Sequence, residues 1–372
     1  MTTTTTTIPP TATQASLAPP ALRRLVAREY REQRPVAVRA VAWNPLGNRV
    51  ATATAASAAA VRVWNPERAD VRYSTELRQH STAAGGGGGG GGGADAIAWD
   101  PTLSDRLCVC ATAAGTVRLW DVRANTCLAS TSSATLMPAA AIYAPDGSVI
   151  AIMPARGGRT IMFLDAKSLQ PAGKPYLDPD QSAGDFTVAV FAFTTDRVVL
   201  VVGLSSGILR FVHVGGGPGD QPKVLASVPA HRAAITAAQF DPLGRYLAVG
   251  SADSLVSIWQ LHDLSCLRTI TFASASSFPV RALSFSFDGA FLAVVFIPDR
   301  PTPASSNNGS NNIYVASVES GNQVHAFPLR SAVTDLQWHP SKYWLAYAGD
   351  PAGLKILATP PSLPSHDRQS KN

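Results

Sequence analysis

The chain has 372 residues, 46% of them hydrophobic and 15% charged, with a formal net charge of +6 at neutral pH. This composition supplies a large apolar core and excludes a disordered polyelectrolyte. Its four cysteines form no C-x-x-C pair and have no histidines at zinc-ligand spacing, which indicates reduced thiols in an intracellular protein. The apolar runs fall short of the roughly 18 residues of a membrane span, and the first residues lack the regions of a secretory signal. We therefore expect a soluble protein without a metal or other cofactor.

The N-terminal part of the chain combines a low-complexity tail with an arginine-rich segment. Residues 1–20 consist mainly of Thr, Pro and Ala, which predicts a disordered tail. The segment 23–33 (RRLVAREYREQ) fits either a short helix or an outer strand, and we favour a strand that the N-terminus donates to the last repeat. Arg23, Arg24 and Arg28 are candidates for contact with an acidic partner or RNA. Solvated arginines remain the simpler interpretation, because no aromatic residues are interleaved with them.

An aromatic residue followed by a turn sequence recurs seven times along the chain. Successive marks are 44 to 56 residues apart, close to the period of roughly 40–45 residues that WD40 blades have. The marks predict an all-β, seven-bladed WD40 β-propeller over residues 21–359, with four strands in each blade. Their aromatic residues are Trp43, Trp99, Tyr143, Phe193, Phe240, Phe285 and Trp338.

Three further segments interrupt or follow the blades. Nine consecutive glycines at 85–93 predict a flexible loop between the first two blades, since such a run loses much backbone entropy on ordering. We disfavour a phosphate-binding loop there, because neither Lys-Ser/Thr nor a helix follows. The polar segment 298–312 is expected to be an exposed insert between two strands of the sixth blade, and residues 360–372 a polar tail.

The stretch 231–260 is the most complete repeat in the chain. His231, Ser251, Asp253 and Trp259 stand where many WD40 blades place a hydrogen-bonded structural tetrad. In that interpretation Asp253 accepts from the histidine ring, the histidine bonds the hydroxyl, and the hydroxyl reaches the indole. The alternative is a Ser-His-Asp nucleophilic site, which we disfavour because the spacing follows the repeat. The other blades lack a full tetrad, so their stability must depend more on apolar packing.

Catalytic chemistry has little support in the sequence. Neither paired carboxylates nor histidines at metal-ligand spacing stand out, and the histidines are scattered along the chain. We therefore expect no catalytic, metal or cofactor-binding residues and no small-molecule substrate. A propeller hydrolase would require carboxylates or histidines that converge on the central channel.

Several stretches resemble one particular family, the third subunit of the THO complex. They are FDPLGRY (240–246), GSADSLVSIW (250–259), PVRALSFS (279–286), VRLWDVR (117–123) and FLDAK (163–167). The resemblance implies a non-catalytic scaffold in the nuclear assembly that couples transcription to packaging and export of messenger RNA. It also implies partners among the large helical THO subunits, and through them an export helicase and adaptor. Whether RNA is contacted directly is left open by the resemblance.

A second class of function stays open at this point. Trp120-Asp121-Val122-Arg123 resembles the Trp-Asp-x-Arg box by which substrate receptors of cullin-type ubiquitin ligases dock their adaptor. Arg123 is therefore an interaction candidate, although an ordinary arginine at a strand end is the simpler interpretation.

Overall fold

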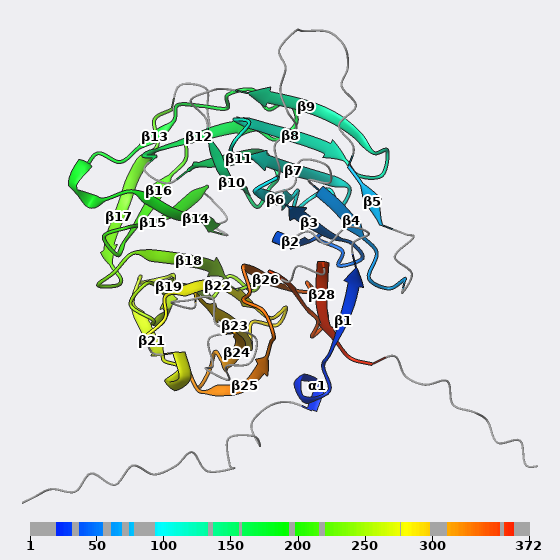
Figure 1. Cartoon of the computed structure of the whole chain (residues 1–372). Coiled ribbons are helices and arrows are strands. Elements are labelled where there is room, and N and C mark those ends of the chain that lie inside the picture. Colours follow the sequence, from blue (N-terminus) through cyan, green and yellow to red (C-terminus); the bar gives the residue numbers. More distant parts are fainter. Residues whose placement is uncertain are drawn as a thin grey trace, which may run out of the picture.

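Figure 1 shows the computed structural model, in which seven four-stranded sheets surround a central axis. The predicted seven-bladed propeller is therefore confirmed. The predicted tails, the glycine loop and the insert up to residue 310 lie almost entirely outside the described part of the chain. The structure describes residues 20–31, 37–54, 61–68, 74–77, 94–132, 137–155, 158–192, 198–215, 220–275, 277–297, 311–349 and 353–360.

Each blade is an antiparallel sheet whose strands we call a to d from the axis outwards. Blade 1 consists of β2 (Val38–Trp43), β3 (Val50–Thr54), β4 (Val61–Trp64) and β5 (Thr75–Glu76). Blade 2 consists of β6 (Ala96–Trp99), β7 (Arg106–Ala111), β8 (Thr116–Asp121) and β9 (Thr126–Ser132). Blade 3 consists of β10 (Pro138–Tyr143), β11 (Val149–Pro154), β12 (Thr160–Asp165) and β13 (Tyr176–Leu177). Blade 4 consists of β14 (Phe186–Ala192), β15 (Val199–Leu204), β16 (Ile208–His213) and β17 (Lys223–Pro229).

The remaining blades follow the same order until the last. Blade 5 consists of β18 (Ile235–Phe240), β19 (Tyr246–Ser251), β20 (Val256–Gln260) and β21 (Cys266–Ile270). Blade 6 consists of β22 (Val280–Phe285), β23 (Phe291–Phe296), β24 (Asn312–Ser317) and β25 (Gln323–Pro328). Blade 7 consists of β26 (Asp335–Trp338), β27 (Leu345–Ala348), β28 (Gly353–Ala358) and, as its outer strand, β1 (Val26–Arg31). The short helices are α1 (Pro20–Arg23), η3 (Gln181–Ala183) and η4 (Ala273–Ala275).

The N-terminal segment 23–33 contains the strand that we favoured for it, and a helical turn ends where the segment begins. A single helical turn, α1, precedes β1, and β1 pairs antiparallel with β28 at the other end of the chain. The predicted donation of an N-terminal strand to the last blade is therefore confirmed. Leu22 and Leu25 are buried against blades 6 and 7, which anchors the helical turn.

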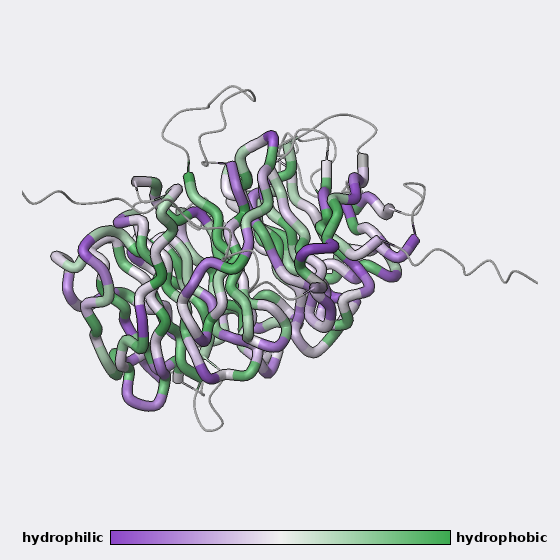
Figure 2. Tube along the Cα trace, turned by 90° about the horizontal axis from the view of Figure 1, so that it is seen from below, coloured by the Kyte–Doolittle hydropathy of each residue, from purple (hydrophilic) through white to green (hydrophobic). Residues whose placement is uncertain are grey.

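The core is divided among the seven seams between neighbouring blades. Each hydrophobic cluster draws its residues from two adjacent blades, and the seventh joins blade 7 to blade 1. The middle strands are apolar almost throughout because they are covered on both faces, whereas the outer strand β17 alternates between exposed and half-buried residues. Figure 2 shows the disc edge-on, with hydrophobic residues concentrated in its interior.

The aromatic marks explain this packing, with one correction in blade 4. Trp43 and Trp338, which end their inner strands, are buried in the seams. In blade 4 the buried residue at this place is Phe191, whereas the predicted mark, Phe193, lies outside the described residues. Residues two apart point to the same face of a strand, so the alternating pattern could not distinguish them.

Tyr30 ties the closing strand to the first blade, and its removal should weaken the ring. Its hydroxyl donates to the Pro66 carbonyl at 2.8 Å, and its ring packs edge-on against Trp64 at 6.1 Å. We expect Tyr30→Phe to lower the free energy of unfolding by about 1 kcal/mol, through loss of one hydrogen bond. Tyr30→Ala should cost about 3–5 kcal/mol, because a cavity remains.

Urea unfolding followed by tryptophan fluorescence would measure both changes. Val26→Ala is the matched control in the same strand, since Val26 is 56% exposed. Equal stability of Tyr30→Ala and Val26→Ala would contradict a closing role for Tyr30.

Candidate functional site

Blade 5 contains a continuous hydrogen-bonded network of four side chains. The Nδ1 atom of His231 lies 3.0 Å from Asp253, and its Nε2 lies 2.7 Å from the hydroxyl of Ser257. The indole nitrogen of Trp259 donates to the same hydroxyl at 2.7 Å. The network joins the loop before β18, the turn after β19 and strand β20 across the blade.

The prediction that Ser251 supplies the hydroxyl of this network is wrong, because the hydroxyl of Ser257 lies between His231 and Trp259. Ser257 and Trp259 are two apart on β20 and share a face, which brings the hydroxyl to the indole. The Ser251 hydroxyl instead donates to the carbonyls of Ala233 and Ala234, at 3.1 and 3.0 Å. It therefore fixes the chain entering β18.

The network is built to be inert. Ser257 is 2% exposed, and its oxygen is already bonded by the imidazole and the indole. A nucleophilic serine must be open to its substrate, and this one is closed to it. The arrangement satisfies buried polar groups and holds the blade together.

A second repeated device fixes the turns between strands a and b. In blade 5 the buried carboxylate of Asp241 accepts from the Arg245 amide and, at 2.8 Å, from the Tyr246 amide. The residue at the same place in four other blades accepts from its own turn in a similar way. These residues are Asn44, Asp100, Ser286 and His339. Sequence reasoning missed this role, although the residue follows the aromatic mark each time.

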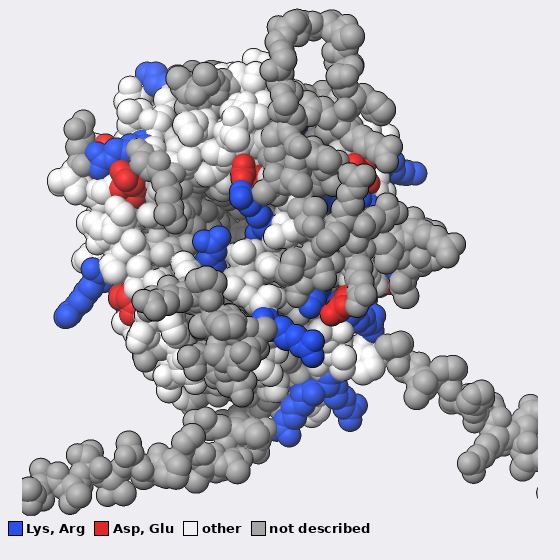
Figure 3. All heavy atoms as spheres, viewed as in Figure 1, with Lys and Arg blue, Asp and Glu red and all other residues white. Residues whose placement is uncertain are grey.

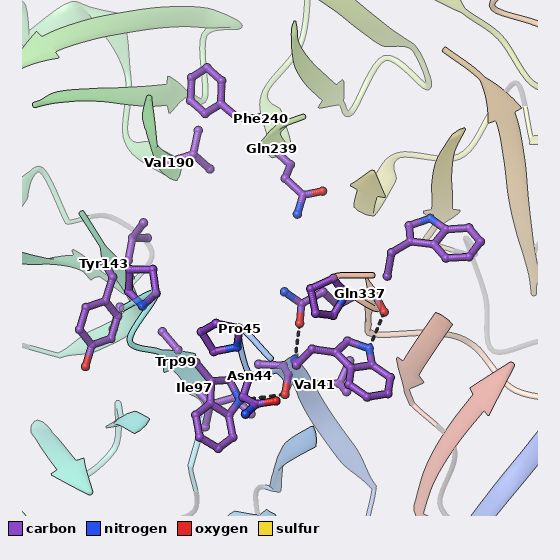
Figure 4. A pocket seen from close by; sticks show the side chains of 18 of the residues that line it. Val41, Asn44, Pro45, Ile97, Trp99, Tyr143, Val190, Gln239, Phe240 and Gln337 are labelled. Carbon is purple, nitrogen blue, oxygen red and sulfur yellow. Dashed lines mark hydrogen bonds between the residues drawn. The ribbon is translucent and has the colours of Figure 1, made fainter. Parts of the chain in front are cut away.

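The central channel contains a pocket of about 580 Å³ lined by the inner strands (Figure 4). Its polar side chains hold neighbouring strands together. Gln239 accepts from the amide of Phe285 at 2.8 Å, and Gln337 accepts from the amide of Trp43. The lining includes one carboxylate, Asp335, and no histidine among the described residues. The channel therefore lacks the convergence of groups that a propeller hydrolase requires.

Asp335 lies at the seam where the ring closes. One carboxylate oxygen accepts from the Val41 amide of blade 1 at 3.0 Å, and the other from the Leu336 amide at 2.9 Å. Burial raises the pKa of this carboxyl to about 6, although both amides and the charge of Arg281 oppose the shift.

The three N-terminal arginine candidates have different surroundings. Arg23 and Arg24 are exposed between the buried residues Leu22 and Leu25. The guanidinium of Arg28 donates to the Thr359 carbonyl and lies over the Trp344 ring, 5.3 Å from its centroid. Arg28 is thus engaged in ring closure, while a contact role for Arg23 and Arg24 stays a prediction. Figure 3 shows the Lys and Arg side chains of one face lying apart, several next to an acidic side chain.

Arg123 is exposed in the turn that follows Trp120-Asp121. It lines a pocket of about 220 Å³ between blades 1 and 2, together with Arg49 and Arg68. The remaining lining residues are Val63, Trp64, Asn65, Thr75 and Val122. Sequence reasoning singled out Arg123 but not the other two arginines, which come from a different blade.

Other classes of site have no support in the described chain. No helix there is long and apolar enough to cross a membrane. Nor do three or more His, Cys, Asp or Glu side chains of that part come together as a metal site. Cys108 and Cys110 are buried on β7, and Cys127 and Cys266 are exposed, all as free thiols.

Comparison with known proteins agrees with this geometry. The model of the WD domain, G-beta repeat, matches residues 222–260, which include all four residues of the blade 5 network. The β-propeller domain of Cps50 (Swd1) from Myceliophteria thermophila superposes with a TM-score of 0.68 and 16% identity, over 88% of this chain and 98% of that domain. This likeness shows the fold alone. The protein is a WD-repeat β-propeller.

Two relatives align with most of the chain. THO complex subunit 3 of Arabidopsis thaliana is 31% identical over 338 residues, which are 88% of this chain and 91% of that protein. WD repeat-containing protein AAC3 of Dictyostelium discoideum is 25% identical over 83% of this chain, which spans 60% of that protein. The chain belongs to the family of THO complex subunit 3. It is accordingly a non-enzymatic WD-repeat protein.

The blade 5 network predicts coupled effects of two substitutions. Ser257→Ala should lower the free energy of unfolding by about 1–3 kcal/mol, because the buried indole N–H and imidazole lose their partner. Trp259→Phe removes the indole N–H, and it should cost less in the Ser257→Ala background than in the wild type. A double-mutant cycle by chemical denaturation measures this coupling. Strictly additive effects would show that the two side chains act independently.

Asp335 predicts a pH-dependent stability difference. Because the pKa of Asp335 is raised in the folded protein, the protonated carboxyl favours folding at low pH. This contribution to stability is lost as pH rises through about 6 and the carboxyl ionises. We expect the free energy of unfolding of Asp335→Asn, relative to that of the wild type, to increase by on the order of 2 kcal/mol from pH 4 to pH 8. Thermal unfolding across this range, with the exposed Asp146→Asn as control, would measure the difference. A difference independent of pH would refute the raised pKa.

Proposed function

We propose that the protein is a scaffold subunit of a nuclear THO complex and takes part in coupling transcription to messenger RNA packaging and export. The observation that carries the proposal is the alignment with THO complex subunit 3 of Arabidopsis thaliana, at 31% identity over 88% of this chain and 91% of that protein. The proposed partners are the other THO subunits and, through them, an export helicase and an adaptor. The proposed location is the nucleus.

The structure supports a binding role of this kind. Its polar networks hold blades and turns in place, as the Asp253–His231–Ser257 network and the hydrogen bonds of Asp241 do. Such a rigid disc presents many loops on two faces, and propellers with these features bind other macromolecules through them. The comparisons do not favour the ligase-receptor alternative, although Arg123 is exposed as that alternative would require.

Affinity purification from nuclear extract tests the proposal. We expect the tagged chain to recover the other THO subunits, and its depletion to leave polyadenylated RNA in the nucleus. The matched control is a tagged WD-repeat propeller of another family, which should recover none of these subunits. Recovery of a cullin-ligase adaptor without THO subunits would refute the assignment and revive the alternative.

A further inference from the structure

The seam between blades 1 and 2 presents positive charge in a pocket. Arg49, Arg68 and Arg123 line it, and no carboxylate is among the lining residues. Arg49 is neutralised by Asp105 of the neighbouring blade, at 2.9 Å. The guanidinium of Arg123 has no hydrogen bond or ion pair with any other described residue. The nearby Asp121 accepts from the Ala124 amide at 2.8 Å.

The pocket is rigid on the blade 1 side and at the seam. The a–b turns of the two blades are joined by the Arg49–Asp105 pair and by a hydrogen bond from the Asn44 side chain to the Ser104 carbonyl, at 3.3 Å. Beneath it lies Trp64, which is buried in the core of the seam between blades 7 and 1. A preformed arginine site of this kind fits a carboxylate, because guanidinium groups bind it through paired hydrogen bonds.

Two leucines extend the same surface with apolar area. Leu46 is 65% exposed and Leu103 is 43% exposed, each in the a–b turn of its blade. The blade 1 turn leads into Arg49, which lines the pocket, and the blade 2 turn ends at Asp105, which pairs with Arg49. The turn caps Asn44 and Asp100 are buried and hold their turns in place, so the leucines are directed outwards by a fixed backbone. Exposed apolar side chains that flank a charged pocket are typical of a protein-binding surface.

The chemistry favours a protein over a nucleic acid at this surface. Nucleic acid binding without base pairing relies on exposed aromatic rings for stacking, and the pocket's aromatic residue, Trp64, is only 2% exposed. Phosphates would match the arginines but leave both leucines without an apolar partner. An acidic segment that also contains apolar side chains satisfies both.

We propose that the seam surface formed by Leu46, Arg49, Arg68, Leu103 and Arg123 docks an acidic amphipathic segment of a protein partner. A carboxylate of that segment occupies the arginine pocket, and its apolar side chains cover the two leucines. The inference rests on the proposed function, since the partner is then one of the other THO subunits.

Two double variants test the two halves of the surface. Arg68→Glu with Arg123→Glu reverses the pocket's charge, and Leu46→Ser with Leu103→Ser removes its apolar flanks. Each chain is co-expressed with the other THO subunits and purified by its tag. We expect recovery of the subunits to fall about tenfold or more with either variant. Because screening weakens exposed charge pairs, the wild type should also lose more binding than the charge-reversed variant between low and high salt.

The chain offers matched controls on other blades. Lys167 stands in blade 3 where Arg123 stands in blade 2, and Leu243 stands in blade 5 where Leu46 stands in blade 1. Both are exposed, so Lys167→Glu reverses one positive charge and Leu243→Ser removes one exposed leucine away from the seam. We expect wild-type recovery of the subunits with both controls. Thermal unfolding midpoints of all four variants check that the ring remains folded.

The outcomes separate this inference from the proposed function. If the wild type recovers THO subunits and the seam variants recover them equally well, the docking surface is refuted and the scaffold function stands. If the wild type recovers none, both are refuted. If the charge-reversed chain loses binding to a single-stranded RNA oligomer while recovering the subunits normally, the surface binds nucleic acid and the protein-docking proposal is overturned.

Discussion

The structure depends on the burial of each blade's two faces against its neighbours. No sheet contains a core of its own, because each hydrophobic cluster spans a seam between two blades. The burial is complete only if the ring is closed. Closure requires strands from both ends of the chain, as β1 pairs with β28 and the inner strands β2 and β26 come into contact. The polar groups at this seam, including Asp335 and the Tyr30 hydroxyl, are bonded to blade 1.

This constraint explains why so much of the fold could be predicted from the sequence. The aromatic residue that ends each inner strand must fill a seam, so it recurs once per blade and marks the count of seven. The arginine-rich segment was harder to assign, since its strand exists only through pairing with residues at the far end of the chain. Its period could not separate the helical turn at Pro20–Arg23 from the strand at Val26–Arg31.

Predictions of individual side-chain partners were less successful than the prediction of the fold. Ser251 and Ser257 both stand near His231 in the blade, and only the facing of β20 decides which one reaches the imidazole. Arg28 looked like a surface charge until its pairing strand placed it over Trp344. The arginine pocket joins Arg49 and Arg68 to Arg123 across a seam, and contacts across a seam leave no periodic signal within one repeat.

Pairing of the first strand with the last one also orders events during synthesis. β1 leaves the ribosome long before β28 exists, so it must wait without its partner while all the other blades form. A waiting strand with free backbone groups can recruit the edges of other chains. Within β1, the charged residues Arg28 and Glu29 make such capture unfavourable, because charged side chains on an unpaired strand discourage its pairing with other chains. The strand that closes the finished ring is thus protected from pairing with other chains until β28 is available.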